Sequence, residues 1–357
     1  MPQIKEIAYV EFYVGNASQA AHFYRTAFGF QPVAKATLET GERERTSFVL
    51  RQNQITLILT SALTPASPVA EHVRTHGDSV KDIAFAVDDA AQTFAEVVKR
   101  GARPLLQPTV FEQNGARVVK ATIEAFGDTV HSFIERHGDD ATFLPGYQPL
   151  ARPPMVKPIG LSAIDHVAVC VEPGALRRWF DFYIDVFDFR HSHQEDIVTE
   201  NTAMNSGVVQ NENGSIQIPI MEPAPHKSAS QIEEYLAFHQ GSGAQHIALL
   251  SEDILGTVRA LRENGIEFLE TPANYYDRLE ETPERVDEDI SRLRELGILL
   301  DHDRWGALLQ IFTKPLHDRP TTFMEIIQRK GARGFGGGNI KALFESIERE
   351  QALRGNL

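Results

Sequence analysis

The sequence predicts an α+β protein made of two similar halves, each containing two βαβββ units whose strands curl into an open barrel. Three observations lead to this prediction. The chain of 357 residues has room for about two domains, the order of its motifs occurs twice, and a proline-rich stretch separates the two copies. The composition, with 42% hydrophobic and 24% charged residues, is that of an ordinary globular protein.

The first unit of each half has the same order of strand, helix and aromatic turn. The corresponding segments are 7–10, 22–24 and 28–30 in the first half and 164–167, 179–183 and 187–189 in the second. Short runs rich in β-branched and aromatic residues, at 46–50 and 54–59, are expected to be strands that follow the first helix.

The second unit of each half begins with a glycine-containing turn and a buried strand. The strands are 82–85 and 245–248, and the helices that follow are predicted over 92–100 and 255–264. Gly101 and Gly265 directly follow these helices, as is common where a helix ends. A third pair of similar segments, 133–138 and 326–331, closes the two halves. Such an internal repeat favours a duplicated fold.

The prolines from Pro149 to Pro158 mark the boundary between the halves. Proline fixes φ and cannot continue a helix, so we expect a semi-rigid connection. The predicted domains are an N-terminal βαβββ-repeat domain over 1–150, a linker over 151–160 and a C-terminal domain over 161–357.

The net charge of −14 and the single cysteine, Cys170, exclude several classes of protein. An acidic chain repels phosphate backbones, so we expect no nucleic-acid partner. One cysteine cannot form an intrachain disulfide, a Cys-based zinc site or an iron–sulfur cluster, and this usage fits the cytoplasm. We also expect no membrane partner and no export, because the first twenty residues lack an apolar signal region and no apolar run is long enough to span a membrane.

Comparison of the two halves identifies three candidate metal ligands. Equivalent strand positions are Tyr9, Asp82 and Ser132 in the first half but His166, His246 and Glu325 in the second. Two neutral imidazoles and one carboxylate form the facial triad, which leaves open coordination positions on Fe(II). A lone strand histidine is more often a hydrogen-bonded core residue, but a buried carboxylate in an apolar strand needs a cation or hydrogen bonds. The prediction is therefore a metal site in the second half and none in the first.

The other histidines form no recognisable ligand set. His191 and His193 have a spacing that places both rings on one strand face, but acidic loop residues adjoin them, so we expect a surface loop there. The remaining histidines are expected to be solvated or to cap helices: His22, His72, His76, His131, His137, His226, His239, His302 and His317.

Polar residues in apolar strands and helices are candidates for binding a small molecule, because a few placed polar groups give an apolar pocket its specificity. These residues are Ser206, Gln231, Gln245 and Gln310. A satisfied core or edge amide is the alternative interpretation. Near the C-terminus, a glycine run at 336–338 precedes an apolar stripe with helical spacing that begins at Ile340. This pattern predicts a helix on a glycine hinge, which would suit a lid over the site.

Several motifs resemble the 4-hydroxyphenylpyruvate dioxygenase and 4-hydroxymandelate synthase family of the vicinal oxygen chelate superfamily. They are Ile164-Asp165-His166-Val167, Gln245-His246-Ile247-Ala248, Leu309-Gln310-Ile311-Phe312-Thr313, Phe323-Met324-Glu325-Ile326-Ile327-Gln328-Arg329 and the glycine-rich segment from Gly334 to Phe344. The resemblance covers essentially the whole chain. It implies Fe(II) held by His166, His246 and Glu325, with 4-hydroxyphenylpyruvate and O2 as substrates. It also implies that Phe312 and Phe335 contact the substrate.

Two positions bear on the product that the resemblance implies. The dioxygenases of the family are similar to one another in having Phe where this chain has Ile340 and Asn where it has Met221, whereas the synthases are aliphatic at both positions. A smaller aliphatic side chain would leave the substrate ring room to rotate. The leading prediction is therefore 4-hydroxymandelate synthase, with benzylic hydroxylation; Pro219 resembles the dioxygenases instead. The alternative is 4-hydroxyphenylpyruvate dioxygenase, which forms homogentisate.

Two rival functions remain open from the sequence. A metal-free protein that sequesters a ligand would need a vestigial triad, and bound iron would argue against it. An extradiol dioxygenase shares two histidines and a glutamate but acts on catechols. Exposed first-half strands without a site are plausible subunit contacts, so we expect a homo-oligomer, either a dimer or a tetramer.

Overall fold

The structure is a computed structural model that describes residues 3–113, 115–138, 143–144, 146–150, 156–280 and 289–356. The first half contains β1 (Ile4–Tyr13), α1 (Ala17–Phe28), β2 (Gln31–Ala36), the short 3-10 helix η1 (Leu38–Thr40), β3 (Arg45–Gln52), β4 (Ile55–Ala62), α2 (Pro68–His76), β5 (Ser79–Val87), α3 (Ala90–Lys99), β6 (Pro104–Gln113), β7 (Ala116–Glu124), β8 (Val130–His137) and β9 (Gln148–Pro149). Residues 151–155 of the expected linker lie outside the described residues.

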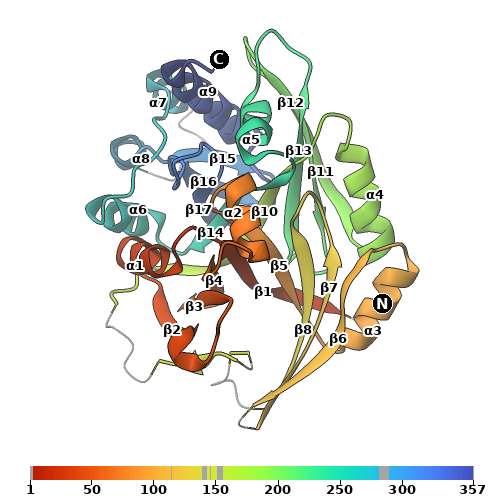
Figure 1. Cartoon of the computed structure of the whole chain (residues 1–357). Coiled ribbons are helices and arrows are strands. Elements are labelled where there is room, and N and C mark those ends of the chain that lie inside the picture. Colours follow the sequence, from red (N-terminus) through yellow and green to blue (C-terminus); the bar gives the residue numbers. More distant parts are fainter. Residues whose placement is uncertain are drawn as a thin grey trace.

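The second half repeats this order and adds helices. It contains β10 (Leu161–Cys170), α4 (Leu176–Phe187), β11 (Arg190–Val198), β12 (Ala203–Gln210), β13 (Gln217–Ala224), α5 (Gln231–His239), β14 (Gly243–Ser251), α6 (Ile254–Glu263), α7 (Ala273–Glu280), α8 (Ile290–Leu296), β15 (Leu299–Asp303), β16 (Gly306–Phe312), β17 (Phe323–Lys330) and α9 (Gly337–Arg354). Figure 1 shows the helices on the outside of the curled strands.

Each half forms one curled sheet with the same internal pattern. The strand orders are β6-β7-β8-β5-β1-β4-β3-β2-β9 and β11-β12-β13-β10-β14-β17-β16-β15. In the first sheet β1 pairs parallel with β4 and antiparallel with β5, and β5 pairs parallel with β8; β10, β13, β14 and β17 repeat this arrangement. The predicted α+β fold of two repeated halves is therefore confirmed.

The helix ends follow local sequence signals. Asp89 precedes α3 and its side chain accepts a hydrogen bond from the Gln92 backbone N–H. Ser230 and Glu233 form a capping box at the start of α5. Gly29 ends α1 with φ of 70°, and a Cβ at this position would lie 2.8 Å from the Lys157 carbonyl oxygen, so only glycine fits this close approach.

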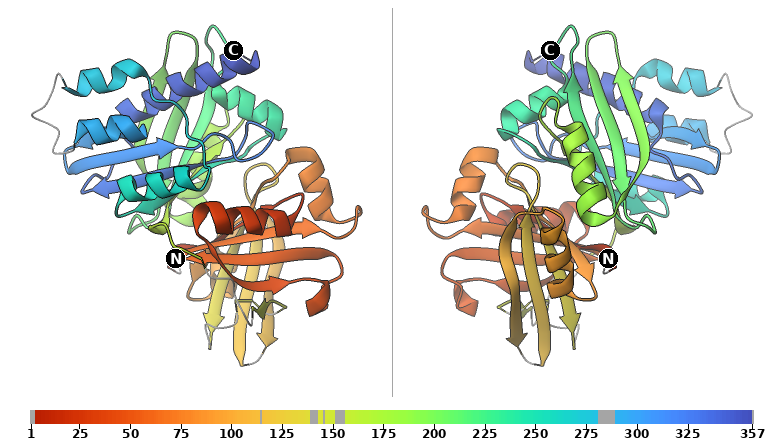
Figure 2. Two further views of the ribbon diagram at one scale, coloured as in Figure 1. Left: turned by 90° about the vertical axis from the view of Figure 1, so that its left-hand side faces the viewer. Right: turned by 90° about the vertical axis from the view of Figure 1, so that its right-hand side faces the viewer.

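The two halves pack against each other through one continuous hydrophobic core. Figure 2 shows the first half, in red to yellow, beneath the second half, in green to blue. Across this junction Phe85 and His131 meet the ring of Phe187, and His131 Nε2 lies 2.8 Å from the Tyr183 hydroxyl. The halves are thus joined by buried aromatic and polar contacts.

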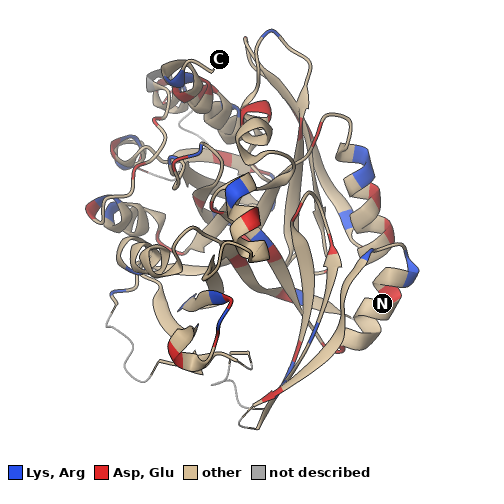
Figure 3. Cartoon of the chain, viewed as in Figure 1, with Lys and Arg blue, Asp and Glu red and all other residues tan. Residues whose placement is uncertain are grey.

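Charged residues lie mainly on the outer faces of the molecule. Figure 3 shows acidic and basic residues interspersed over the helices, while the central strands of each sheet are largely uncharged. In the described part of the chain, no helix combines the length and apolarity needed to cross a bilayer.

The C-terminal helix differs from its prediction at one end. Gly337 and Gly338 form the first turn of α9, and only Gly336, with φ of 72°, precedes the helix in a left-handed conformation. The Gly338 N–H donates to Oδ2 of Asp301. The glycine hinge is therefore shorter than predicted, because this carboxylate stabilises the exposed N–H groups at the helix start.

Candidate metal centre

His166, His246 and Glu325 lie on the neighbouring strands β10, β14 and β17. His166 pairs with Ala248 of β14, and Ala248 pairs with Glu325 of β17. Since side chains alternate between the faces of a sheet, this register points all three toward the interior of the curled sheet. One ligand atom from each lies within 4.8 Å of the others. The Oε2 atom of Glu325 lies 3.2 Å from His166 Nε2 and 3.6 Å from His246 Nε2.

Hydrogen bonds fix the two imidazoles so that their Nε2 atoms face this point. His166 Nδ1 lies 2.8 Å from Asp165 Oδ1, and His246 Nδ1 lies 3.2 Å from Gln245 Oε1. Both partners are acceptors, so each Nδ1 carries the proton and each Nε2 of a neutral ring presents a lone pair. Two lone pairs and a carboxylate oxygen at one buried point fit a cation.

The Glu325 carboxylate is held by a chain of side-chain hydrogen bonds. Gln310 Nε2 donates to Glu325 Oε1 at 2.9 Å, and Asn339 Nδ2 donates to Gln310 Oε1 at 2.8 Å. The Tyr275 hydroxyl donates in turn to Asn339 Oδ1 at 2.8 Å. Because Asn339 belongs to α9 and Tyr275 to α7, the site couples the last strand to both helices.

The protonation of the site follows from its burial and its two carboxylates. Burial disfavours a charged ring at His166, but Glu325 and Asp165 outweigh it and raise the pKa of His166 to about 9. Burial and the charge of His166 lower the pKa of His246 well below its usual value. Burial also opposes ionisation of Asp165, yet Arg329 and His166 hold the pKa of that carboxyl well below its usual range. Asp165 therefore stays ionised and can accept the hydrogen bond that orients His166.

A cavity of about 580 Å³ opens above the three ligands. It is lined by all eleven residues that the sequence singled out: His166, Ser206, Met221, Gln231, Gln245, His246, Gln310, Phe312, Glu325, Phe335 and Ile340. Its walls are mainly apolar. Gln231 Oε1 is buried there and has no hydrogen-bond partner among the described residues. An unpartnered acceptor in an apolar cavity is suited to a ligand hydroxyl.

Local sequence patterns did not indicate every residue that lines this cavity. His193 and Glu195 also line it, and the His193 ring lies 6.3 Å from that of Phe335. The expectation of a surface loop at His191 and His193 is therefore wrong, because this segment is strand β11. The alternation of His193, Glu195 and Ile197 on one strand face was the available signal.

The expectation that the remaining histidines are solvated or cap helices is also wrong in part. His72, His76, His131 and His239 are buried. His239 meets His76 of α2, and His131 packs against Tyr183 and Phe187 of α4; both contacts join distant segments, which local sequence patterns do not reveal.

In the first half, the ammonium of Lys120 lies beside the positions that correspond to the three candidate metal ligands of the second half. Asp82 accepts hydrogen bonds from Tyr9 at 3.1 Å, from Ser132 Oγ at 2.6 Å and from Lys120 Nζ at 3.2 Å. Burial disfavours the ammonium, but Asp82 and Glu11 raise the pKa of Lys120, so it stays charged. The Lys120 ammonium thus neutralises the carboxylate.

Comparison with known proteins agrees with this geometry. Residues 3–146 match the family model described as hydroxyphenylpyruvate dioxygenase, HPPD, N-terminal, and residues 163–298 match the glyoxalase/bleomycin resistance protein/dioxygenase superfamily. The chain is 43% identical to 4-hydroxyphenylpyruvate dioxygenase of Yarrowia lipolytica, over 98% of this chain and 93% of that protein. It is 44% identical to the same enzyme of Danio rerio, over 98% and 91%.

A solved structure shows the same architecture. A triple mutant of 4-hydroxymandelate synthase from Streptomyces coelicolor superimposes with a TM-score of 0.89 at 41% identity, over 98% of this chain and 100% of that chain. The duplicated fold and the His-His-Glu site define an oxidoreductase of the dioxygenase class within the glyoxalase superfamily. Within that class, the chain belongs to the 4-hydroxyphenylpyruvate dioxygenase family.

Proposed function

We propose that this protein is a 4-hydroxyphenylpyruvate dioxygenase, which converts 4-hydroxyphenylpyruvate and O2 into homogentisate and CO2. The observation that carries the proposal is the convergence of His166, His246 and Glu325 within 4.8 Å at the base of a mainly apolar cavity. The relatives from Yarrowia lipolytica and Danio rerio bear this name. Both oxygen atoms of O2 are then found in homogentisate, one in the carboxylate formed at the former keto carbon and one in the new ring hydroxyl. The substrate carboxylate leaves as CO2, and this decarboxylation supplies two of the four electrons that reduce O2, while oxidation of the ring supplies the other two.

Fe(II) is the metal that we propose for the three ligands, and when bound it would coordinate the keto acid and activate O2. The chain itself positions these ligands. Asp165 and Gln245 orient the imidazoles, and Gln310 holds the far oxygen of Glu325. Such fixed partners keep the donor atoms in place before the substrate arrives.

The cavity walls would hold the substrate and exclude water. The ring of Phe335 lies edge-on to His166 at 5.2 Å, and Phe312 lies 6.2 Å from His246. We assign the substrate hydroxyl to Gln231, whose buried Oε1 lacks a partner among the described residues. Ser206, Met221 and Ile340 would contact the aromatic ring. Helix α9 would act as a lid, since Ile340 and Leu343 on it line the cavity.

A second candidate function is 4-hydroxymandelate synthase, and one observation favours it. Met221 and Ile340 both line the cavity, and the synthases resemble this chain in having aliphatic side chains at these two positions. A substrate ring that can rotate into the freed space would present its benzylic carbon to the site. The two functions share substrate, cosubstrate and CO2 release, and differ only in the carbon that is oxygenated.

Product identification tests both candidates. Protein loaded with Fe(II) is incubated with 4-hydroxyphenylpyruvate and O2, and the aromatic products are separated and identified by mass and retention time. Homogentisate as the main product supports the proposal, and 4-hydroxymandelate as the main product overturns it in favour of the synthase. The Glu325→Gln variant, which loses a charged ligand, is the control and should form neither.

We also propose the wider organisation of the protein. Residues 161–357 would form the catalytic domain, residues 1–150 a domain without a catalytic metal site, and residues 151–160 the linker. The exposed edge strand β6, where Leu105 and Val110 are exposed, supports a homo-oligomer, a dimer or a tetramer. The lack of a cysteine other than Cys170 supports the cytoplasm as the compartment.

A further inference from the structure

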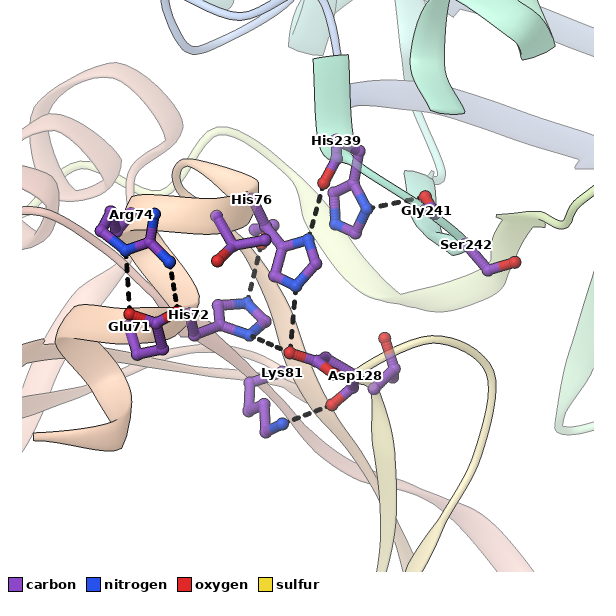
Figure 4. Close-up of polar contacts among 12 residues, drawn as sticks. Glu71, His72, Arg74, His76, Lys81, Asp128, His239, Gly241 and Ser242 are labelled. Carbon is purple, nitrogen blue, oxygen red and sulfur yellow. Dashed lines mark hydrogen bonds and ion pairs between the residues drawn. The ribbon is translucent and has the colours of Figure 1, made fainter. Parts of the chain in front are cut away.

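A second group of potential metal ligands lies at the junction of the two halves, away from the cavity. It consists of His72 and His76 of α2 and Asp128 of the turn between β7 and β8, and we call it the junction cluster (Figure 4). His72 and His76 are four residues apart, so both rings project from one face of the helix. The catalytic triad comes from β10, β14 and β17 instead.

The ligand atoms of the junction cluster already lie close together. One from each residue is found within 4.8 Å of the others. His76 Nε2 lies 3.0 Å and His72 Nδ1 3.9 Å from Asp128 Oδ2. Zinc bonds of about 2.0–2.2 Å place tetrahedral ligands roughly 3.3 Å apart. Small side-chain rotations are therefore enough to complete the site.

In each of the two rings, one nitrogen faces the Asp128 carboxylate, and the other hydrogen bonds of the ring do not make that nitrogen a clear donor. His76 Nδ1 lies 2.6 Å from the His239 carbonyl oxygen, so this nitrogen carries a proton and donates. A neutral His76 then turns the lone pair of Nε2 toward Asp128. His72 Nε2 bonds Ser79 Oγ at 2.9 Å, while its Nδ1 is buried and lacks a hydrogen-bond partner in the described part of the chain. A shared cation resolves this arrangement.

The surroundings fix the cluster in place and leave one side open. His72 and His76 are 4% and 5% exposed, whereas the Asp128 side chain is 59% exposed, so water can reach the remaining coordination position. Lys81 Nζ donates to the Asp128 backbone carbonyl and holds the turn. Next to Asp128, a Cβ at Gly127 would collide with the Ser242 carbonyl oxygen, so glycine lets this turn contact the second half.

We propose that the junction cluster binds one divalent transition-metal ion, with Zn²⁺ as the preferred ion, through His72 Nδ1, His76 Nε2, Asp128 Oδ2 and water. Two imidazoles, a carboxylate and water are a ligand set that Zn²⁺ accepts. The bound ion joins α2 to the β7–β8 turn. Because His76 also bonds the carbonyl of His239 at the end of α5, the ion stiffens the contact between the two halves.

Metal counting on the full-length protein tests this proposal without reference to turnover. Protein freed of metal with a chelator is titrated with Co²⁺, which replaces Zn²⁺ and gives visible ligand-field absorption, and the bound equivalents are counted. We expect His72→Gln to bind one equivalent fewer than the wild type. His22→Gln, at an exposed histidine of α1, is the matched control and should bind as much as the wild type.

A folded His72→Gln variant that binds as many equivalents as the wild type overturns the proposal, because the junction cluster then holds none of the bound metal. Asp128→Asn covers the case in which His72→Gln does not fold, since its side chain is largely exposed. We expect this variant to bind the junction Co²⁺ at least about tenfold more weakly. Unchanged affinity in Asp128→Asn would equally overturn the proposal. The Fe(II)-dependent turnover of both variants should stay at the wild-type value, so failure of the proposed function would be seen separately.

Discussion

Asp165 Oδ1 lies 2.8 Å from Nδ1 of the neighbouring His166 and fixes the orientation of that ring. Arg329 of β17 holds both oxygens of Asp165, with Nε at 2.6 Å from Oδ2 and a terminal nitrogen at 2.8 Å from Oδ1. The strand that carries Glu325 thus also supplies the arginine that positions the first imidazole. The contact between Asp165 and Arg329 thus connects His166 of β10 to the strand that carries Glu325.

This link predicts the effect of Asp165→Asn. The amide cannot pair with Arg329 as a carboxylate does, so His166 loses its fixed orientation and part of its basicity. We expect the affinity for Fe(II) to fall about 10–100-fold, measured by competition with a chelator. Asp181→Asn, which breaks the exposed Arg177–Asp181 pair of α4, is the control and should leave the affinity unchanged. Equal affinities in all three proteins would refute the positioning role.

The ammonium of Lys120 is expected to stabilise the first half. Lys120→Met leaves the buried Asp82 carboxylate without its cation, and breaking a buried ion pair in this way costs about 3–5 kcal/mol. The double variant Asp82→Asn/Lys120→Met removes both charges and should recover most of this loss in the free energy of unfolding. Urea denaturation measures all three proteins. A double variant no more stable than Lys120→Met would contradict the charge argument.

His131 is expected to make the stability depend on pH. Burial lowers the pKa of His131 to about 4, below the usual value near 6.5. Between these values only the unfolded chain takes up the proton, so the free energy of unfolding decreases as the pH falls from 6.5 toward 4. At pH 5 the loss due to this residue is about 2 kcal/mol.

The comparison is with His131→Gln, which has no titrating ring but retains hydrogen-bonding groups. Denaturation at pH 5 and pH 7 should show a smaller loss in this variant than in the wild type, by about that 2 kcal/mol. The same loss in both proteins would mean that His131 does not titrate as its burial indicates.

Ile340 is expected to influence the product distribution. Its aliphatic side chain leaves space in the cavity that a phenyl ring would fill, so the wild type should form some 4-hydroxymandelate beside homogentisate. Ile340→Phe should lower that fraction, as measured from the separated products. Ile340→Leu keeps the volume and should not change it. The same ratio of 4-hydroxymandelate to homogentisate in the wild type and in Ile340→Phe would rule out the steric explanation.

The amino-acid sequence alone determined the duplicated fold, because the same order of motifs occurs twice and strand alternation, helical periodicity and capping residues are local signals. Helix α3, expected over 92–100, spans Ala90–Lys99. Comparison of the two halves also singled out His166, His246 and Glu325. The equivalent strand positions in the first half hold Tyr9, Asp82 and Ser132. The sequence alone therefore showed that the second half has a possible set of metal ligands and the first half does not.

Only the tertiary structure decided which distant side chains meet. Arg329 reaches Asp165 across the sheet, His193 turns into the cavity, and the junction cluster brings His72 and His76 to Asp128. These contacts depend on the register of paired strands and on how the two halves pack. No local periodicity encodes either, because both are set by the sum of many long-range contacts.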